Sequence, residues 1–151
     1  MNGVLLDTCA IIRLASGAGE LSRAAMEEIA KAPLAYVSPI SLWEIALKVK
    51  SGNLVITGEP ETFFKDAVEN YDLTVLPLSL EVMAKSVDLP EIHKDPADRF
   101  IIASALLNGL PVVTTDRRFP EYGVEVISSY PLCVRRAACD LIKFHSQGKE
   151  N

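Results

Sequence analysis

The sequence contains little cysteine and little histidine. Three cysteines and two histidines occur among its 151 residues. An odd number of cysteines without C-x-x-C spacing supports neither a disulfide framework nor a zinc site, and His93 and His145 lie far apart along the chain. These scarcities argue against a small disulfide-stapled domain and against a zinc-binding protein.

Long apolar runs are also absent. No run approaches the roughly 20 residues that a membrane-spanning helix needs. The first residues, Met1-Asn2-Gly3, lack the basic start that signal peptides have. We therefore expect a soluble cytoplasmic protein that makes no contact with a membrane.

Positive charge is in deficit. Fifteen basic residues stand against 20 acidic ones, which gives a formal net charge of −5. A chain with this charge balance is not expected to bind the nucleic-acid backbone both tightly and nonspecifically. An RNA partner would therefore have to bind at a local site. Residues 129–151 are mildly basic, which is typical of a solvated helix face.

What the sequence does contain is a regular alternation of apolar, strand-like runs with helical segments. Such alternation indicates an α/β protein whose parallel sheet is covered on both faces. We expect strands at 3–6, 34–37, 73–76, 111–115 and 124–127, and helices at about 8–16, 21–31, 39–50, 60–70, 80–87 and 96–107. The length and the hydrophobic content of 49% suit one domain over residues 1–130, followed by a helical extension at 131–151 with no assigned role.

Two aspartates directly follow expected strands. Asp7 comes after the first strand, and Asp116 comes after the fourth. Taken singly, Asp7 reads as the N-cap of the next helix and Asp116 reads as a turn residue. Both positions also lie at carboxyl ends of strands, which is where open α/β sheets bind ligands.

Glu44 lies inside an expected helix. Helical spacing places it on one stripe with Trp43 and Leu47, and this stripe is expected to face the core. An ion pair with Lys48 would contribute only about 0.2–0.5 kcal/mol, which is too little to offset burial of a charge. We therefore favour a functional role for Glu44. For Trp43 we favour a core position over the alternative that its ring stacks on a nucleic-acid base.

Asp95 and Asp98 share one helix start. Asp95 precedes Pro96 and is the natural cap, whereas Asp98 begins an apolar stripe that continues with Ile101 and Ile102. Negative groups are stabilised at this end of a helix by its dipole. We expect Asp95 to cap the helix and Asp98 to point inward.

A parallel sheet would gather Asp7, Asp98 and Asp116 at one edge, and Glu44 can reach that edge from its helix. Close carboxylates repel by about 4 kcal/mol per pair at an effective dielectric near 20, so a cation must offset the repulsion. Oxygen ligands without His or Cys select hard ions such as Mg²⁺ or Mn²⁺. Such ions suit phosphodiester cleavage, because they activate water and neutralise charge on the phosphate.

These acids occur in four short motifs. In chain order they are Leu5-Leu6-Asp7-Thr8, Ser41-Leu42-Trp43-Glu44-Ile45-Ala46-Leu47-Lys48, His93-Lys94-Asp95-Pro96-Ala97-Asp98-Arg99 and Val113-Thr114-Thr115-Asp116. In this order and spacing, over about residues 3–128, the chain resembles the PIN-domain family, and specifically the VapC-like toxins of toxin–antitoxin pairs. The segment after Ser128 lies outside the resemblance.

The resemblance implies a PIN domain at 1–130, with a three-layer fold in which helices flank a five-stranded parallel sheet. It also implies a homodimer, metal-dependent endonucleolytic cleavage of RNA, and a VapB-like antitoxin that blocks the acidic groove. The residues that carry over as acids coordinating Mg²⁺ or Mn²⁺ are Asp7, Glu44, Asp98 and Asp116, with Thr115 as a hydrogen-bonding neighbour. Asp95 does not carry over as a ligand.

Several nearby residues are departures or have secondary roles. Cys9 stands where this subgroup often has histidine and Arg13 where an aromatic residue is common, which leaves substrate or partner preference open. Cys9 reads as a small buried filler, and His93 reads as part of the loop before the helix cap. Five basic residues near the acids are candidates for contacts with RNA phosphates: Arg13, Lys48, Arg99, Arg117 and Arg118. The alternative for each is a side chain that is solvated or ion-paired at the surface.

Three other functions compete with this interpretation. A phosphatase with an aspartate nucleophile would have a second aspartate two residues after Asp7, where Cys9 stands. A phosphoreceiver module would need a lysine after its fifth strand, and nothing suitable follows 124–127. The third is a PIN-fold module that binds RNA or a partner without nuclease activity. The intact acids argue against it, and a metal-dependence assay separates the two.

Overall fold

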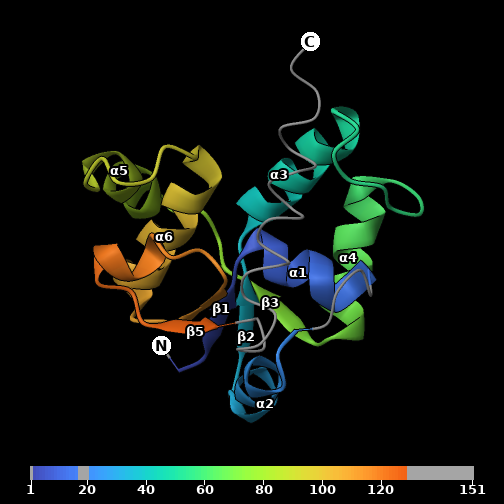
Figure 1. Cartoon of the computed structure of the whole chain (residues 1–151), viewed down its shortest axis with the longest axis horizontal. Coiled ribbons are helices and arrows are strands. Elements are labelled where there is room, and N and C mark those ends of the chain that lie inside the picture. The colour runs from blue at the N-terminus through green and yellow to red at the C-terminus, as the bar shows by residue number, and fades with distance from the viewer. Residues whose placement is uncertain (1, 17–20, 129–151) are drawn as a thin grey trace.

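Five short strands form one parallel sheet in the computed structural model, which describes residues 2–16 and 21–128. The strands are β1 (Val4–Leu6), β2 (Ala35–Val37), β3 (Leu73–Val75), β4 (Val112–Thr114) and β5 (Val126–Ser128). Their order across the sheet is β3-β2-β1-β4-β5, and every neighbouring pair is parallel. The first strand of the chain is therefore the central strand of the sheet (Figure 1).

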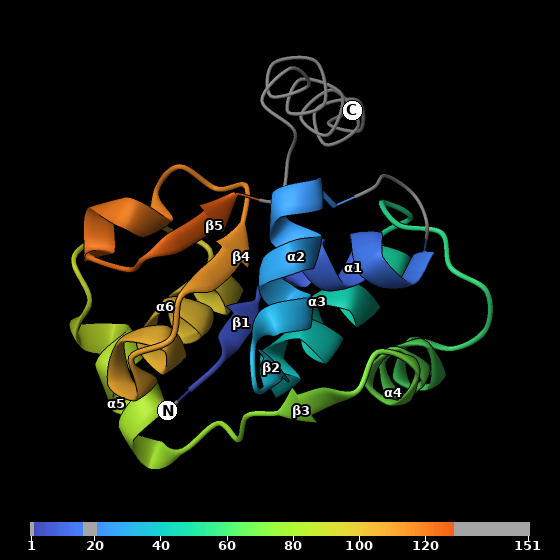
Figure 2. The same ribbon diagram turned by 90° about the horizontal axis from the view of Figure 1, so that it is seen from below.

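Helices cover both faces of the sheet. They are α1 (Thr8–Ser16), α2 (Arg23–Lys31), α3 (Pro39–Lys50), α4 (Pro60–Asn70), α5 (Leu80–Asp88), α6 (Pro96–Asn108) and the short 3₁₀ helix η1 (Phe119–Tyr122). Because side chains alternate along a strand, Val4 and Leu6 of β1 pack with α1 to α4, and Leu5 packs with α5 and α6 on the opposite face. Figure 2 shows these layers on either side of β1. The predicted α/β fold, with three layers and a five-stranded parallel sheet flanked by helices, is confirmed.

Local capping chemistry sets several helix boundaries. The Ser38 hydroxyl accepts from the N–H of Ile40 over 3.2 Å, and Pro39 fills the first position of α3. Gly109 ends α6 in the left-handed conformation, with φ 60°. Both α3 and α4 have the predicted bounds. Among the helices of residues 2–16 and 21–128, none combines the length and the apolar character needed to cross a bilayer.

The segment before the last strand differs from the prediction. The strand β5 begins at Val126 instead of 124, and η1 precedes it where only a turn was expected. The fully buried Phe119 anchors this helical turn in the core, and Gly123 reverses the chain with φ 81°. The extension predicted at 131–151 lies outside the described residues.

The carboxyl ends of β1 and β4 lie side by side. Leu6 pairs with Val113, and the N–H of Asp7 donates to the Val113 carbonyl over 3.1 Å. The residue after β1 is thus held against the end of β4. Helices α3 and α6 contact each other and complete this edge of the sheet.

Candidate metal centre

Asp7 is a buried carboxylate at the junction of β1 and α1, with 5% of the residue exposed. Its Oδ1 accepts from the N–H of Ala10 over 2.8 Å, so it caps α1. Its Oδ2 accepts from the Thr114 hydroxyl over 2.5 Å. Burial raises the pKa of Asp7 to about 6, because loss of solvation and the charge of Glu44 outweigh the hydrogen bonds to the carboxylate. A nearby cation would favour its ionised form.

Glu44 reaches the same edge from α3. Its side chain is 13% exposed, and its Oε2 accepts from the Thr8 hydroxyl over 3.1 Å. The Thr8 hydroxyl also lies 3.0 Å from the Ser41 hydroxyl, inside the core. The Nζ of Lys48 lies 3.3 Å from Oε1 of Glu44. Glu44 therefore does form the ion pair with Lys48 that we considered too weak to offset the burial of its charge. It also accepts the hydrogen bond from Thr8 of α1.

The stripe of α3 that carries Glu44 does not face the core. Ser41 and Ile45 are fully buried, whereas Trp43 and Leu47 are 48% and 45% exposed. The prediction that Trp43 is a core residue is wrong. The physical reason is that α3 packs on the sheet by another face, so that this stripe lines a cavity of about 590 Å³ against the start of α6.

Asp95 and Asp98 divide their roles as predicted. The Asp95 carboxylate accepts from the N–H of Ala97 over 2.9 Å and caps α6. The Asp98 side chain turns inward and is 17% exposed. Burial raises the pKa of Asp98 to about 8, and the surrounding carboxylates add to the effect, with the charge of Glu44 foremost, then those of Asp7, Asp95 and Asp116.

Asp116 is tied to Asp7 through one buried hydroxyl. Thr114 donates its hydroxyl proton to Asp7, and its Oγ1 accepts from the N–H of Asp116 over 3.0 Å. The neighbour that joins the two acids is thus Thr114, where the sequence pointed to Thr115. Arg118 donates to both carboxylate oxygens of Asp116, over 3.1 and 3.0 Å. Although burial opposes it, these bonds lower the pKa of Asp116 below its usual value.

His93 is the residue that the sequence interpretation missed. It is 3% exposed, and its Nε2 lies 2.9 Å from Oδ2 of Asp98 and 2.8 Å from Oδ2 of Asp116. Its Nδ1 accepts from the N–H of Asp95 over 3.1 Å. Its ring packs edge-on against Phe119 at 6.1 Å between centroids. The only signal in the sequence was its place just before the Asp95 cap, which does not reveal a contact with Asp116.

The basic residues predicted near the acids have different surroundings. The Arg99 guanidinium donates to carbonyls at the end of α5 and in the loop that follows, with distances from 2.8 Å upward. It holds this connection in place, so we leave it out of the proposed RNA contacts. Lys48 and Arg118 each pair with one of the acids. Arg117 is exposed, and Arg13 is partly buried.

Cys9 is a free, partly buried cysteine within reach of the charges of Asp7, Glu44 and Asp98. Burial raises the pKa of its thiol to about 12, and the charge of Asp7 contributes to the rise. Its thiol therefore stays protonated at neutral pH. A protonated thiol is a poor metal ligand and a poor nucleophile.

The fold thus brings Asp7, Glu44, Asp98 and Asp116 within electrostatic reach of one another, although they lie on four different segments. Ligand-type atoms of His93, Asp98 and Asp116 lie within 4.8 Å of each other. Burial is the largest cause of the raised pKa values of Asp7 and Asp98, and the charges of the neighbouring acids add to it. This donor chemistry fits a hard divalent cation such as Mg²⁺ or Mn²⁺, because such ions prefer carboxylate oxygens.

Comparisons with known proteins place the chain in a family. No curated protein sequence matches it at a significant level. Among solved structures, it is similar to FitAcB from Neisseria gonorrhoeae, with 23% identity and a TM-score of 0.60 over 85% of this chain and 99% of that chain. It is also similar to a DNA-bound VapBC from Salmonella typhimurium, with 20% identity and a TM-score of 0.61 over 84% and 98%. A third similar structure is VapBC-5 from Mycobacterium tuberculosis, with 20% identity and a TM-score of 0.53 over 82% and 96%. These similarities establish the shared fold.

The family model supplies the assignment. The model of the PIN domain matches residues 4–125, which is well over half of the 151 residues. The matched range contains the five motif acids and His93 and ends just before β5. The chain therefore belongs to the PIN domain family.

Proposed function

We propose that the protein is an endoribonuclease that hydrolyses RNA phosphodiester bonds with Mg²⁺ or Mn²⁺ held by Asp7, Glu44, Asp98 and Asp116. The observation that carries the proposal is the environment of Asp98, a mostly buried carboxyl group surrounded by the charges of four other acids. Such an excess of negative charge has no structural benefit without a cation. Membership of the PIN domain family supports the same chemistry.

When bound, the metal ion would activate a water molecule and neutralise charge on the attacked phosphate. The residues of the chain prepare this chemistry by fixing the carboxylates in place. The Thr114 hydroxyl orients Asp7, and His93 orients Asp98 and Asp116. Arg118 keeps Asp116 ionised by lowering its pKa. The acids are thus arranged for binding before a cation arrives.

We also propose that this activity makes the protein the toxin of a VapBC-like pair in the cytoplasm, neutralised by a VapB-like antitoxin. Support comes from the similar structures, which are described as toxin–antitoxin complexes or VapBC proteins.

We propose a homodimer as well. The helix α5 leaves Leu80, Met83 and Val87 exposed by 84%, 45% and 78%, and these side chains recur at helical spacing.

The test of the nuclease is metal-dependent cleavage of structured RNA by purified protein free of antitoxin. We expect internal cuts with Mg²⁺ or Mn²⁺, none in excess chelator, and recovery when the metal is restored, because the acid cluster has no other way to activate water. Gel analysis of end-labelled RNA measures this. Cleavage that persists in chelator would refute the proposal, and RNA binding without cleavage in either metal would favour the module without nuclease activity.

The test of the toxin role is growth of cells that express the protein. Expression without a partner should arrest growth, and co-expression of the proposed VapB-like antitoxin should relieve the arrest. The matched control is Asp98→Asn, which should be soluble and harmless because it lacks one proposed metal ligand. Normal growth with soluble, active enzyme would point to a housekeeping nuclease instead.

A further inference from the structure

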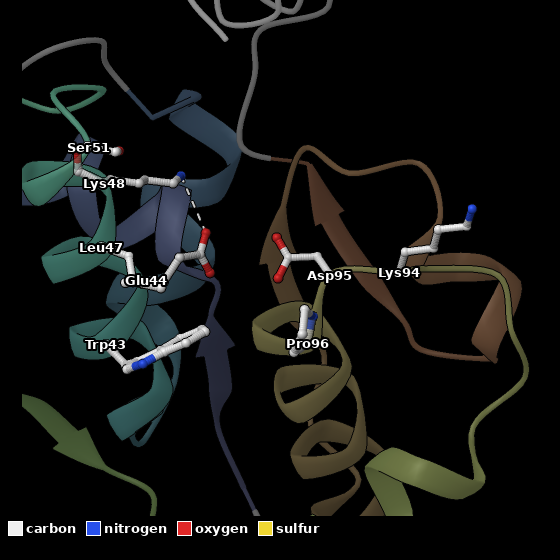
Figure 3. Close-up of a pocket in the computed structure, with 8 residues that line it drawn as sticks. All are labelled: Trp43, Glu44, Leu47, Lys48, Ser51, Lys94, Asp95 and Pro96. Atoms are coloured by element: carbon white, nitrogen blue, oxygen red, sulfur yellow. Dashed lines mark hydrogen bonds and ion pairs between the residues drawn. The ribbon is translucent and has the colours of Figure 1, made fainter. Parts of the chain in front are cut away.

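A cavity of about 590 Å³ opens next to the acids, between α3 and the start of α6. We call it the Trp43 groove and define it by Trp43, Leu47 and Lys48 on one wall and Lys94 and Pro96 on the other. Glu44 also lines it, so the groove is continuous with the proposed metal centre. Figure 3 shows the two walls facing each other. A cavity of this size can hold a nucleotide, since ligand pockets typically measure about 300–1,000 Å³.

Trp43 is the only tryptophan of the chain, and 48% of it is exposed. Its indole lies below the Glu44 carboxylate in Figure 3 and extends toward Pro96 on the other wall. A half-exposed indole costs free energy in water unless something covers it. Aromatic side chains beside a nucleic-acid path stack on bases, and Trp offers the largest ring for this contact.

The charges around the groove also suit a nucleic-acid strand. Lys48 extends into the groove toward Glu44, whereas Lys94 stands at the opposite rim and points outward (Figure 3). The carboxylates of Glu44 and Asp95 face each other across the groove (Figure 3), and a cation at the proposed centre would offset their charge. Lys94 at the rim can therefore contact a phosphate of a nucleotide whose base enters between the walls, and Lys48 becomes available for a second contact if a cation takes over its partner Glu44.

We propose that the Trp43 groove binds one unpaired RNA base next to the scissile phosphate, by stacking on the Trp43 indole. This inference rests on the proposed function, because only an RNA substrate would bring a base to this position. A base in an A-form duplex is covered on both faces by its neighbours and cannot stack on a side chain. The groove therefore selects single-stranded segments and loops over duplex.

Because Trp43 is the only tryptophan, its fluorescence reports on the groove directly. We would titrate the Asp98→Asn variant in Mg²⁺, which binds without cutting, with a short oligoadenylate, either alone or annealed to oligouridylate. The single strand should quench the fluorescence, and the duplex should leave it nearly unchanged. Equal quenching by both forms would overturn the proposal.

Three substitutions of Trp43 separate stacking from simple apolar contact. Trp43→Ala and Trp43→Leu should each weaken single-strand binding and raise KM by about 5- to 150-fold, the range known for loss of one stacked base. Trp43→Phe should keep most of the affinity, because it retains an aromatic face. Because Trp43 is half exposed, these variants should fold, which melting curves would verify. Leu binding as well as Trp would show that no stacking occurs.

The same experiment distinguishes this inference from the proposed function. If wild-type protein cuts RNA with Mg²⁺ while Trp43→Leu keeps the wild-type KM, the nuclease stands and the groove assignment falls. If wild-type protein neither binds nor cuts RNA, both fall. A Trp43→Leu variant that cuts normally but escapes the antitoxin would identify the groove as a protein-binding surface, which also overturns the proposal.

Discussion

Asp98→Asn should abolish RNA cleavage and, in the metal-free protein, raise the melting temperature above that of wild type. Activity should fall by more than about 100-fold, the upper end for residues that only orient a metal ligand. The stability gain follows from the pKa of Asp98, which lies at about 8. Near pH 7 a carboxyl group with this pKa costs the folded state a few kcal/mol, at about 1.4 kcal/mol per pKa unit, and asparagine removes the cost. The melting temperature should rise by roughly 5–15 °C.

The loss of cleavage and the rise in melting temperature should appear together. The change in stability on adding metal tests whether both come from the loss of a metal ligand. Metal binding should stabilise wild type by about 2.7 kcal/mol at a hundredfold excess over Kd. Asp98→Asn should reduce this response. The matched control is Asp95→Asn on the same helix turn, which should keep both the activity and the metal response, because Asn caps a helix nearly as well as Asp. A less stable Asp98→Asn variant with a full metal response would make Asp98 a structural residue.

The stability of the metal-free protein should fall as the pH rises from 5 to 8. Asp7 and Asp98 have folded-state pKa values of about 6 and about 8, both raised from the ordinary aspartate value of 3.8. The folded state therefore binds more protons than the unfolded state in this range, and its stability is lost as they leave. The loss should be on the order of 5 kcal/mol between pH 5 and 8. Asp116, whose pKa is lowered, has the opposite dependence, but its effect is confined to more acidic pH.

Urea denaturation at each pH, with chelator and then with saturating Mn²⁺, measures this prediction. Binding displaces protons from the carboxyl groups, so metal affinity should rise with pH. The difference in stability between loaded and metal-free protein should therefore widen toward pH 8. Stability that is unchanged over this range in chelator would mean that the cluster carries no unbalanced charge.

The parts of the fold that could be predicted depend on short-range sequence patterns, such as helix caps and periodicity, that span only a few residues. Ser38 before Pro39 and Asp95 before Pro96 mark helix starts by their own chemistry, and both helices begin where predicted. The inward direction of Asp98 followed from helical periodicity. The gathering of the four acids followed from the rule that parallel strands end on one edge. Their proposed role as ligands rests on the family and awaits the experiments above.

The missed parts depend on contacts between distant segments. His93 touches Asp116 across 23 positions of the chain, and Thr114 touches Asp7 across 107 positions. No local pattern reports such pairs. The error at Trp43 has another cause. Helical periodicity identifies the residues that share one face of a helix, but it does not show whether that face packs against the core. A stripe that lines a solvent-filled groove and a stripe that lines a core have the same spacing.

The hydrogen bond from the Asp95 backbone to His93 has a consequence for metal selectivity at the proposed centre. Because an N–H donates to Nδ1, that nitrogen carries no proton, and the ring proton resides on Nε2. The lone pair of Nε2 is therefore occupied where the ring faces Asp98 and Asp116, and the imidazole acts there as a donor. This buried ring nitrogen is thus withheld from coordination as long as the Asp95 N–H donates to Nδ1. At the proposed metal centre, zinc and copper, which gain most from an imidazole ligand, would therefore lose their advantage over magnesium and manganese.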